Sequence, residues 1–133
     1  MISDEQRKRL LNAALAARER SYAPYSGYRV GSAVLTEDGT IVAGCNVENG
    51  SFGLTICAER TAVFSAVAQG QRQFSAMALV TADGAAPCGA CRQVLAEFCN
   101  DLPIWIARSD ALDQPRMVLL NQLLPERFQK PSA

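Results

Sequence analysis

The sequence predicts an α/β protein, a three-layer α/β/α sandwich in which helices cover both faces of a central mixed five-stranded sheet. Segments with strand character alternate with amphipathic helical segments along the chain, which is typical of this fold class. The 133 residues are 49% hydrophobic and 20% charged, so the chain can bury a core without disulfide bonds. Because no internal repeat or linker interrupts the pattern, we expect one domain over residues 1–133.

The first half of the chain is expected to form a helix followed by a β-hairpin. Ser3 and Gln6 have the spacing of a capping box, and apolar residues then recur at helical spacing, which predicts a helix over residues 3–20. Two strand-like segments follow, at 28–36 and 40–47. The acidic residues and glycine between them indicate a tight connection, so these strands are expected to pair as a hairpin.

The second half of the chain is expected to alternate helices and strands. A helical pattern begins at Thr55 and ends near Gly70, and a further helix is expected within 85–99, after Pro87. The remaining strands are expected at the apolar segments 76–81, 103–107 and 116–120. About eight residues separate the last two strands, too few for a helical crossover, and this spacing predicts an antiparallel pair.

The charge balance favours a small neutral ligand over a polyanion. Thirteen basic residues match thirteen acidic residues, so the chain has no net positive charge with which to bind nucleic acid or an anionic membrane. The sequence contains no run of 18 apolar residues and no visible export signal. We therefore expect no membrane partner and a cytoplasmic location.

The cysteine pattern favours a metal site over disulfide bonds. The chain has five cysteines, an odd number, and two of them form a C-x-x-C pair at Cys88 and Cys91. It has no histidine. Any zinc site must therefore use thiolates and carboxylates, and any general base must be a carboxylate.

Three of these cysteines are expected at the N-termini of two helices. Cys57 precedes the second predicted helix, while Cys88 and Cys91 lie in the first turn of the third. A helix N-terminus stabilises a thiolate, which is the form that binds zinc. Three protein ligands leave the fourth position open for water, as in catalytic zinc sites, and Arg60 is expected to offset the net negative charge of the site.

Two motifs match the pattern of zinc-dependent deaminases, in which a His/Cys-x-E element supplies a ligand and a proton-carrying glutamate, and a P-C-x-x-C element completes the metal site. They are Cys57-Ala58-Glu59 and the segment from Pro87 to Cys91. The chain also resembles the cytidine deaminase family, in its short homotetrameric all-cysteine class, over nearly its whole length. This resemblance is carried by the segments YSGYRVGSAV, GCNVENGSFGLTICAERTAVFSAV, PCGACRQVLAEF and LLPERF.

The resemblance implies one Zn²⁺ per chain and the hydrolysis of cytidine and deoxycytidine to uridine and deoxyuridine in pyrimidine salvage. Glu59 is expected to take a proton from water and return protons to the pyrimidine. Asn46 and Glu48 match the residues that hold the ribose hydroxyls. Tyr28 aligns with a phenylalanine whose ring packs on the pyrimidine, and the backbone near Ala58 and Cys88 is expected to bind the base.

The resemblance further implies a homotetramer whose active sites are completed by neighbouring subunits. Three positions are expected to reach a neighbour's ligand, namely Gly50, Phe52 and Phe128. The hydroxyl that Tyr28 carries beyond the phenylalanine of the family needs a polar partner or water if it is buried.

Parts of these motifs also occur in proteins with functions other than nucleoside deamination. A redox dithiol does not explain Glu59, and a structural zinc module needs a fourth ligand, which only Cys45, Cys99 or a carboxylate could supply. We expect these two cysteines to be small buried apolar residues. A deaminase of nucleic acid should have a basic surface. A deaminase of another aminated nucleoside or of a nucleoside-like antibiotic stays open, because the motifs define the reaction and not the ring.

Overall fold

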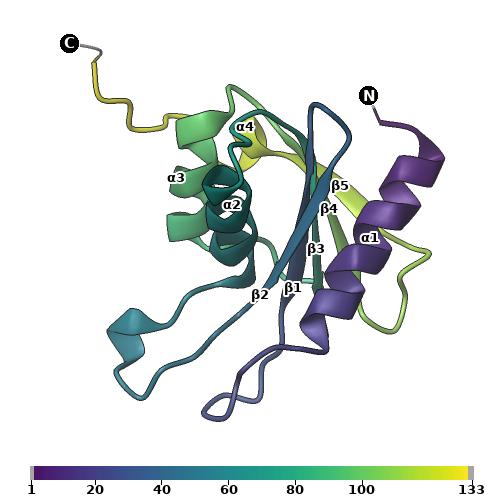
Figure 1. The fold of residues 1–133 in the computed structure, drawn as a ribbon, viewed down its shortest axis with the longest axis vertical. Coiled ribbons are helices and arrows are strands. Elements are labelled where there is room, and N and C mark those ends of the chain that lie inside the picture. The colour runs from purple at the N-terminus through teal and green to yellow at the C-terminus, as the bar shows by residue number, and fades with distance from the viewer. Residues whose placement is uncertain (1, 132–133) are drawn as a thin grey trace.

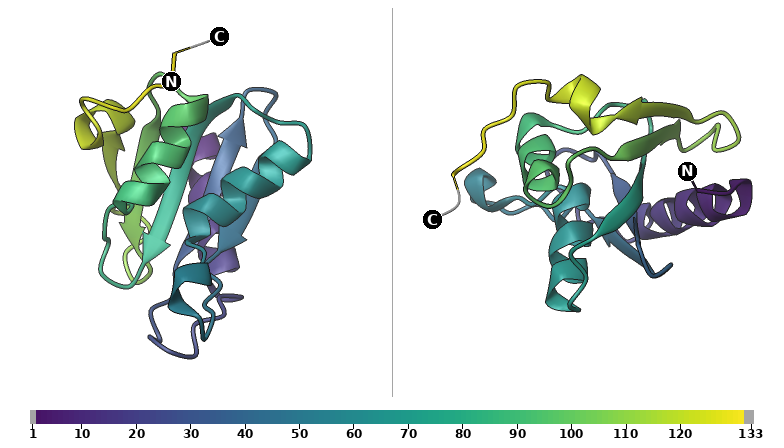
Figure 2. Two further views of the ribbon diagram at one scale, coloured as in Figure 1. Left: turned by 90° about the vertical axis from the view of Figure 1, so that its left-hand side faces the viewer. Right: turned by 90° about the horizontal axis from the view of Figure 1, so that it is seen from above.

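A five-stranded sheet with helices on both faces makes up residues 2–131, the part of the chain that this computed structural model describes (Figure 1). The strands are β1 (Gly31–Thr36), β2 (Ile41–Cys45), β3 (Phe74–Thr81), β4 (Pro103–Arg108) and β5 (Arg116–Leu119). The helices are α1 (Asp4–Arg18), η1 (Phe52–Leu54, a 3₁₀ turn), α2 (Ala58–Ala68), α3 (Gly89–Phe98) and α4 (Leu120–Leu123). Helix α1 covers one face, and α2 and α3 lie side by side on the other, which confirms the predicted three layers (Figures 1 and 2).

The strand order and directions bring the termini of β1, β2 and β3 together at one end of the sheet. The order is β2-β1-β3-β4-β5, with β3 and β4 parallel and every other pair antiparallel. The predicted hairpin of β1 with β2 and the antiparallel pairing of β4 with β5 are both confirmed. Because β2 and β3 both run antiparallel to β1, the last residues of β2 and β3 and the first residues of β1 lie at the same end of the strands. The loops that lead into α2 and α3 start at this end of the sheet.

Each face of the sheet has its own apolar core. On the α1 face, Leu10 and Ala14 pack against small residues of β1 and β3. On the opposite face, Val63 of α2 and Leu95 of α3 pack on a larger cluster that includes Met77 of β3. Strand β3 supplies side chains to both cores, and all of its residues except Ser75 are buried. Burial on both faces explains its nearly continuous apolar sequence.

Two glycines let helices approach the sheet backbone closely. A Cβ atom at Gly31 of β1 would lie 1.9 Å from the carbonyl oxygen of Ala14 in α1. A Cβ atom at Gly44 of β2 would lie 2.5 Å from the backbone nitrogen of Ala62 in α2. Both glycines therefore have a packing function, one on each face of the sheet.

Several element boundaries differ from the prediction, and side-chain hydrogen bonds explain two of them. The first helix begins after Ser3 with the predicted capping box but ends at Arg18. The first strand starts at Gly31 instead of residue 28, because the Asn46 side chain binds the backbone of Tyr28 and Val30. In the same way, the second strand ends before Asn46.

The second predicted helix starts three residues later than expected. Cys57 has the extended backbone of an N-cap residue, with φ −72° and ψ 153°, so α2 begins at Ala58. It ends before Gly70, whose φ of +88° confirms the glycine stop. The short element η1 lies in a segment where no element was predicted, and α4 begins at Leu120, the last residue of the predicted strand 116–120.

Candidate active site and metal centre

Three cysteine sulfurs form a cluster where α2 and α3 begin. Cys57 and Cys88 are the N-cap residues of the two helices, and Cys91 lies in the first turn of α3. The Sγ atoms of Cys57 and Cys88 are 3.8 Å apart, and those of Cys88 and Cys91 are 3.5 Å apart. All three sulfurs lie within 4.8 Å of one another, the one such group of three or more potential metal ligands in residues 2–131. The predicted ligands are thus brought together.

The sulfur cluster fits a zinc ion. In a tetrahedral site with Zn–S distances of about 2.3 Å, the sulfurs lie roughly 3.8 Å apart, close to the spacings seen here. All three cysteines lie at helix N-termini, where the positive end of the helix dipole favours thiolate ligands. Cys45 and Cys99 do not belong to the cluster, so within the described residues no fourth cysteine closes the site. A fourth position remains open for water, as a catalytic zinc requires.

Arg60 lies against the sulfur cluster from the first turn of α2. Its Nη2 donates a hydrogen bond to Cys57 Sγ at 3.4 Å. Hydrogen bonds to the Cys57 sulfur lower its pKa to about 5, and the bond from Cys91 has a larger effect than the bond from Arg60. The pKa of Cys91 is raised, because its thiol holds the proton of this shared bond and is buried. The predicted role of Arg60, to offset negative charge at the sulfurs, therefore fits its position.

Glu59 is a buried carboxylate beside the cluster. It is the second residue of α2 and is only 4% exposed. Burial raises its pKa, and the nearby Cys57 thiolate raises it further, since both disfavour a second negative charge. Glu59 lies outside the group of sulfur ligands. A carboxyl group with a raised pKa holds a proton more readily than an exposed one, which suits a group that takes up and releases protons.

A cavity of about 190 Å³ connects Glu59 with the cluster. It is smaller than the pockets that enclose a whole drug-sized ligand, so it fits a single ring whose substituents remain at the mouth. Its walls come from the termini of β1, β2 and β3 at one end of the sheet and from the segments where α2 and α3 begin. The lining residues are Tyr28, Val30, Asn46, Thr55, Ile56, Cys57, Glu59, Leu79, Thr81, Ala85, Ala86 and Cys88.

The two predicted ribose-binding residues differ in their positions. Asn46 lines the cavity, but both ends of its amide already bind backbone, through Val30 N at 2.9 Å and Tyr28 O at 2.8 Å. One amide hydrogen and one lone pair therefore remain for a ligand. Glu48 does not line the cavity, and its carboxylate accepts hydrogen bonds from the backbone of Tyr25 and from Ser26.

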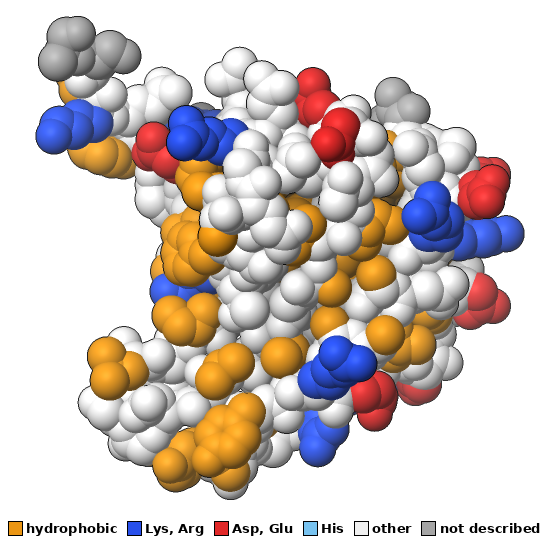
Figure 3. Space-filling view, in the orientation of Figure 1, with side chains coloured by type: hydrophobic (Ala, Val, Ile, Leu, Met, Phe, Trp, Pro, Cys, Tyr) orange, Lys and Arg blue, Asp and Glu red, His pale blue; other side chains and the backbone are white. Residues whose placement is uncertain are grey.

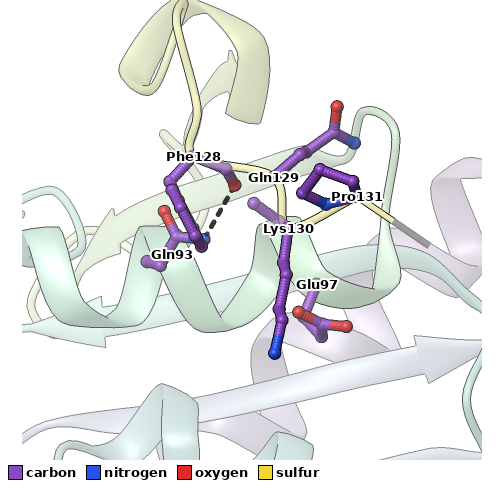
Figure 4. Close-up of a pocket in the computed structure, with 7 residues that line it drawn as sticks. Gln93, Glu97, Phe128, Gln129, Lys130 and Pro131 are labelled. Atoms are coloured by element: carbon purple, nitrogen blue, oxygen red, sulfur yellow. Dashed lines mark hydrogen bonds between the residues drawn. The ribbon is translucent and has the colours of Figure 1, made fainter. Parts of the chain in front are cut away.

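The residues assigned to a neighbour's site all lie outside this cavity. Phe52 is 76% exposed on η1, with Gly50 just before it, and the ring of Phe52 makes an edge contact with Tyr25. Phe128 is 71% exposed in the C-terminal segment over α3, where its carbonyl oxygen accepts a hydrogen bond from Gln93 (Figure 4). Apolar side chains gather on the side of the molecule where α3 and the loop around η1 lie (Figure 3).

Ala58 is completely buried between Cys57 and Glu59. Its backbone N–H is among the first four of α2, which have no acceptor within the helix. Ala58 itself is not among the lining residues of the cavity, but both of its neighbours in the chain, Cys57 and Glu59, are.

Sequence reasoning missed Asp83 and Thr81. Thr81 ends β3 and lines the cavity, and Asp83 accepts a hydrogen bond from the Tyr28 hydroxyl at 2.7 Å. The sequence pattern that could have identified them is the turn-forming segment Thr-x-Asp-Gly, which lies between a predicted buried strand and Pro87.

One expectation about the remaining cysteines is wrong. Cys45 was expected to be buried, but it is only half-buried, because it ends the edge strand β2, where its Sγ donates to the carbonyl oxygen of Arg20 at 3.5 Å. Cys99 is buried as expected, and this burial raises its pKa to about 11.

A three-cysteine cluster and a buried carboxylate at one end of an α/β sheet are the groups found in zinc-dependent hydrolytic enzymes. The description of the family model that matches residues 4–105 is "Cytidine and deoxycytidylate deaminase zinc-binding region". The chain belongs to this cytidine and deoxycytidylate deaminase family.

Curated relatives and solved structures agree with this family. The chain is 47% identical to the cytidine deaminase of Sporosarcina psychrophila, over 92% of this chain and 91% of that protein. It is 44% identical to the cytidine deaminase of Halalkalibacterium halodurans, over 92% of this chain and 93% of that protein. The crystal structure of cytidine deaminase from Burkholderia pseudomallei matches with a TM-score of 0.87 and 45% identity, covering 96% of this chain and all of that one.

Proposed function

We propose that this chain hydrolyses cytidine and deoxycytidine to uridine and deoxyuridine, with release of ammonia, as a single domain acting in pyrimidine salvage. The observation that carries the proposal is the position of Glu59, a buried carboxylate that lines the same cavity as Cys57 and Cys88. The size of the cavity and the cytidine deaminases among the relatives support a pyrimidine as the ring.

The residues of the cavity divide the chemistry between them. Cys57, Cys88 and Cys91 would hold the metal, and zinc there would supply the Lewis acidity that activates water. Glu59 accepts one proton of the attacking water while the water oxygen bonds to C4 of the pyrimidine, and it delivers this proton to N3. Glu59 then takes the remaining proton from the new C4 hydroxyl and passes it to the amino group, so that the C4–N bond breaks, ammonia leaves and C4 becomes a carbonyl.

The environment of Glu59 suits both directions of proton transfer. Its raised pKa strengthens the carboxylate as a base and lets it hold a proton during the reaction. Asn46, with its remaining amide hydrogen, and Glu48 are proposed to bind the ribose at the mouth of the cavity. The free N–H of Ala58 is proposed to bind the base.

An activity panel tests the substrate. The purified zinc-loaded protein should release ammonia from cytidine and deoxycytidine, with the matching loss of ultraviolet absorbance, and should leave adenosine unchanged. Activity confined to a nucleoside-like antibiotic would instead identify the protein as an antibiotic deaminase. No ammonia from any aminated nucleoside would overturn the proposal. Metal analysis of the same sample should give one zinc per chain.

We also propose that the chain assembles as a homotetramer in the cytoplasm, with neighbouring subunits completing each site. The exposed rings of Phe52 and Phe128, which lie outside the cavity of their own chain, support this arrangement. No helix within residues 2–131 is both long enough and apolar enough to cross a membrane. Sedimentation at assay concentration tests the assembly, and a fully active monomer would reject the shared site.

A further inference from the structure

Tyr28, in the loop before β1, is part of the wall of the cavity. The backbone of this residue is held on both sides, because its N–H donates to Ser26 Oγ at 3.0 Å and its carbonyl accepts from Asn46 Nδ2 at 2.8 Å. The side chain itself is 38% exposed, so packing covers only part of it. The wall therefore needs another contact to keep the ring in one orientation.

Asp83 supplies this contact. The Tyr28 hydroxyl donates to Asp83 Oδ1 at 2.7 Å. The same carboxylate oxygen accepts from Thr81 Oγ1 at 3.1 Å and from the backbone N–H of Ala85 at 3.3 Å. Thr81 Oγ1 in turn accepts from the N–H groups of Gly84 and Ala85, so the acceptor sits in a turn that closes on itself.

The protonation states of the two groups favour this hydrogen bond. Partial burial and then the bond to Asp83 raise the pKa of Tyr28, so its hydroxyl remains a donor at neutral pH. The bonds from Tyr28 and Thr81 lower the pKa of Asp83, so the acceptor is an ionised carboxylate. A hydrogen bond to an ionised acceptor is about twice as strong as one between neutral groups.

The bond also joins two separate parts of the site. Tyr28 belongs to the loop before β1, whereas Asp83 belongs to the loop that leads from β3 to Cys88, 55 residues further along the chain. We infer that Asp83 is a positioning residue, which fixes the Tyr28 ring as a preformed wall for the base. This inference rests on the proposed function, in which the cavity takes the pyrimidine.

The expected effect is on substrate binding more than on the chemical step. Without the bond, the Tyr28 side chain gains freedom that substrate must remove on binding, a cost of about 2- to 12-fold in affinity for one ordered side chain. Asp83 is not among the residues that line the cavity, whereas Glu59, Cys57 and Cys88 are, so the proton transfers should keep their geometry. KM should therefore rise while kcat stays within about twofold of the original value.

The test is a set of variants at the two positions, with KM and kcat for cytidine measured for each. Tyr28→Phe and Asp83→Ala should each raise KM by about 2- to 12-fold, and the double variant should be no worse than either single one. Asp83→Asn keeps an oxygen acceptor and should restore most of the affinity. Asp113→Ala, an exposed aspartate in the loop between β4 and β5, is the matched control. Unchanged KM in both single variants, or effects that multiply in the double variant, would overturn the inference.

A second measurement is independent of turnover. NMR couplings of labelled tyrosine should show a single χ1 rotamer for Tyr28 in the original protein and averaging in Asp83→Ala. A single rotamer in both proteins would overturn the positioning role, whatever the activity. If the original protein does not deaminate cytidine, the proposed function fails, and the rotamer measurement still decides whether Asp83 holds the ring.

Discussion

Gly44 brings β2 into backbone contact with α2, the helix that carries Glu59. In Gly44→Ala the new Cβ would lie 2.5 Å from Ala62 N and 2.9 Å from Ala58 O. Ordinary contacts between such atoms begin at about 3.4 Å, so α2 must move away from the sheet by roughly 1 Å. Cys57 and Glu59 must move with it, because they form the start of this helix.

This displacement should damage the site and the core together. Overpacking of this kind costs about 1–3 kcal/mol in the free energy of unfolding. A misplacement of about 1 Å at a catalytic group costs roughly 100-fold in rate. Gly44→Ala should therefore show a lower urea midpoint and a kcat for cytidine about 100-fold below that of the original protein.

Two matched variants separate damage to the site from loss of stability. Gly31→Ala overpacks the opposite face of the sheet against α1, a helix that supplies no residue to the lining of the cavity, and it should destabilise the protein at least as much while the folded fraction keeps its kcat. Gly53→Ala meets no atom within 4 Å and should change the urea midpoint little. If folded Gly44→Ala retains full kcat, the close approach of β2 and α2 does not position Glu59, and the reasoning is refuted.

Three further outcomes are expected. Glu59→Gln should retain zinc while kcat falls by about 10²- to 10⁴-fold, and normal turnover would reject the proton-transfer role. Cys91→Ala should lose zinc and melt at a lower temperature, whereas unchanged metal content would contradict its role as a ligand. Burial raises the pKa of Cys99 to about 11, above its value of roughly 8.5 in the unfolded chain. The folded state thus keeps a proton that the unfolded chain releases, and the free energy of unfolding should fall as pH rises from about 8.5 to 11. Urea titrations of Cys99→Ala should show a weaker fall, and an identical fall would contradict this cause.

The sequence was most informative where chemistry depends on local spacing. Cys88 and Cys91 are close in the chain, and the start of a helix brings both to one side of the cluster, so their joint role could be predicted. The hairpin of β1 and β2 and the antiparallel pair of β4 and β5 followed from short connections. The strand ends could not be placed, because a single side chain, that of Asn46, competes with the sheet for backbone hydrogen bonds.

Contacts between distant loops were beyond the reach of these patterns. The pairing of Tyr28 with Asp83 depends on how two loops meet after the sheet has formed. The position of Phe128 over α3 depends on the path of the C-terminal segment (Figure 4). The half-exposed position of Cys45 follows from β2 being an edge strand, which the strand pattern alone does not reveal.

The cavity lies at one end of the strands, so the loops at the opposite end of the sheet take no part in it. The connection between α2 and β3 lies there, and its residues from Gly70 to Arg72 are exposed or partly exposed. Surface loops of this kind tolerate inserted domains. A fluorescent reporter or an affinity module inserted after Gly70 would interrupt none of the segments that line the cavity, so this loop is an attachment point for immobilising or fusing the enzyme.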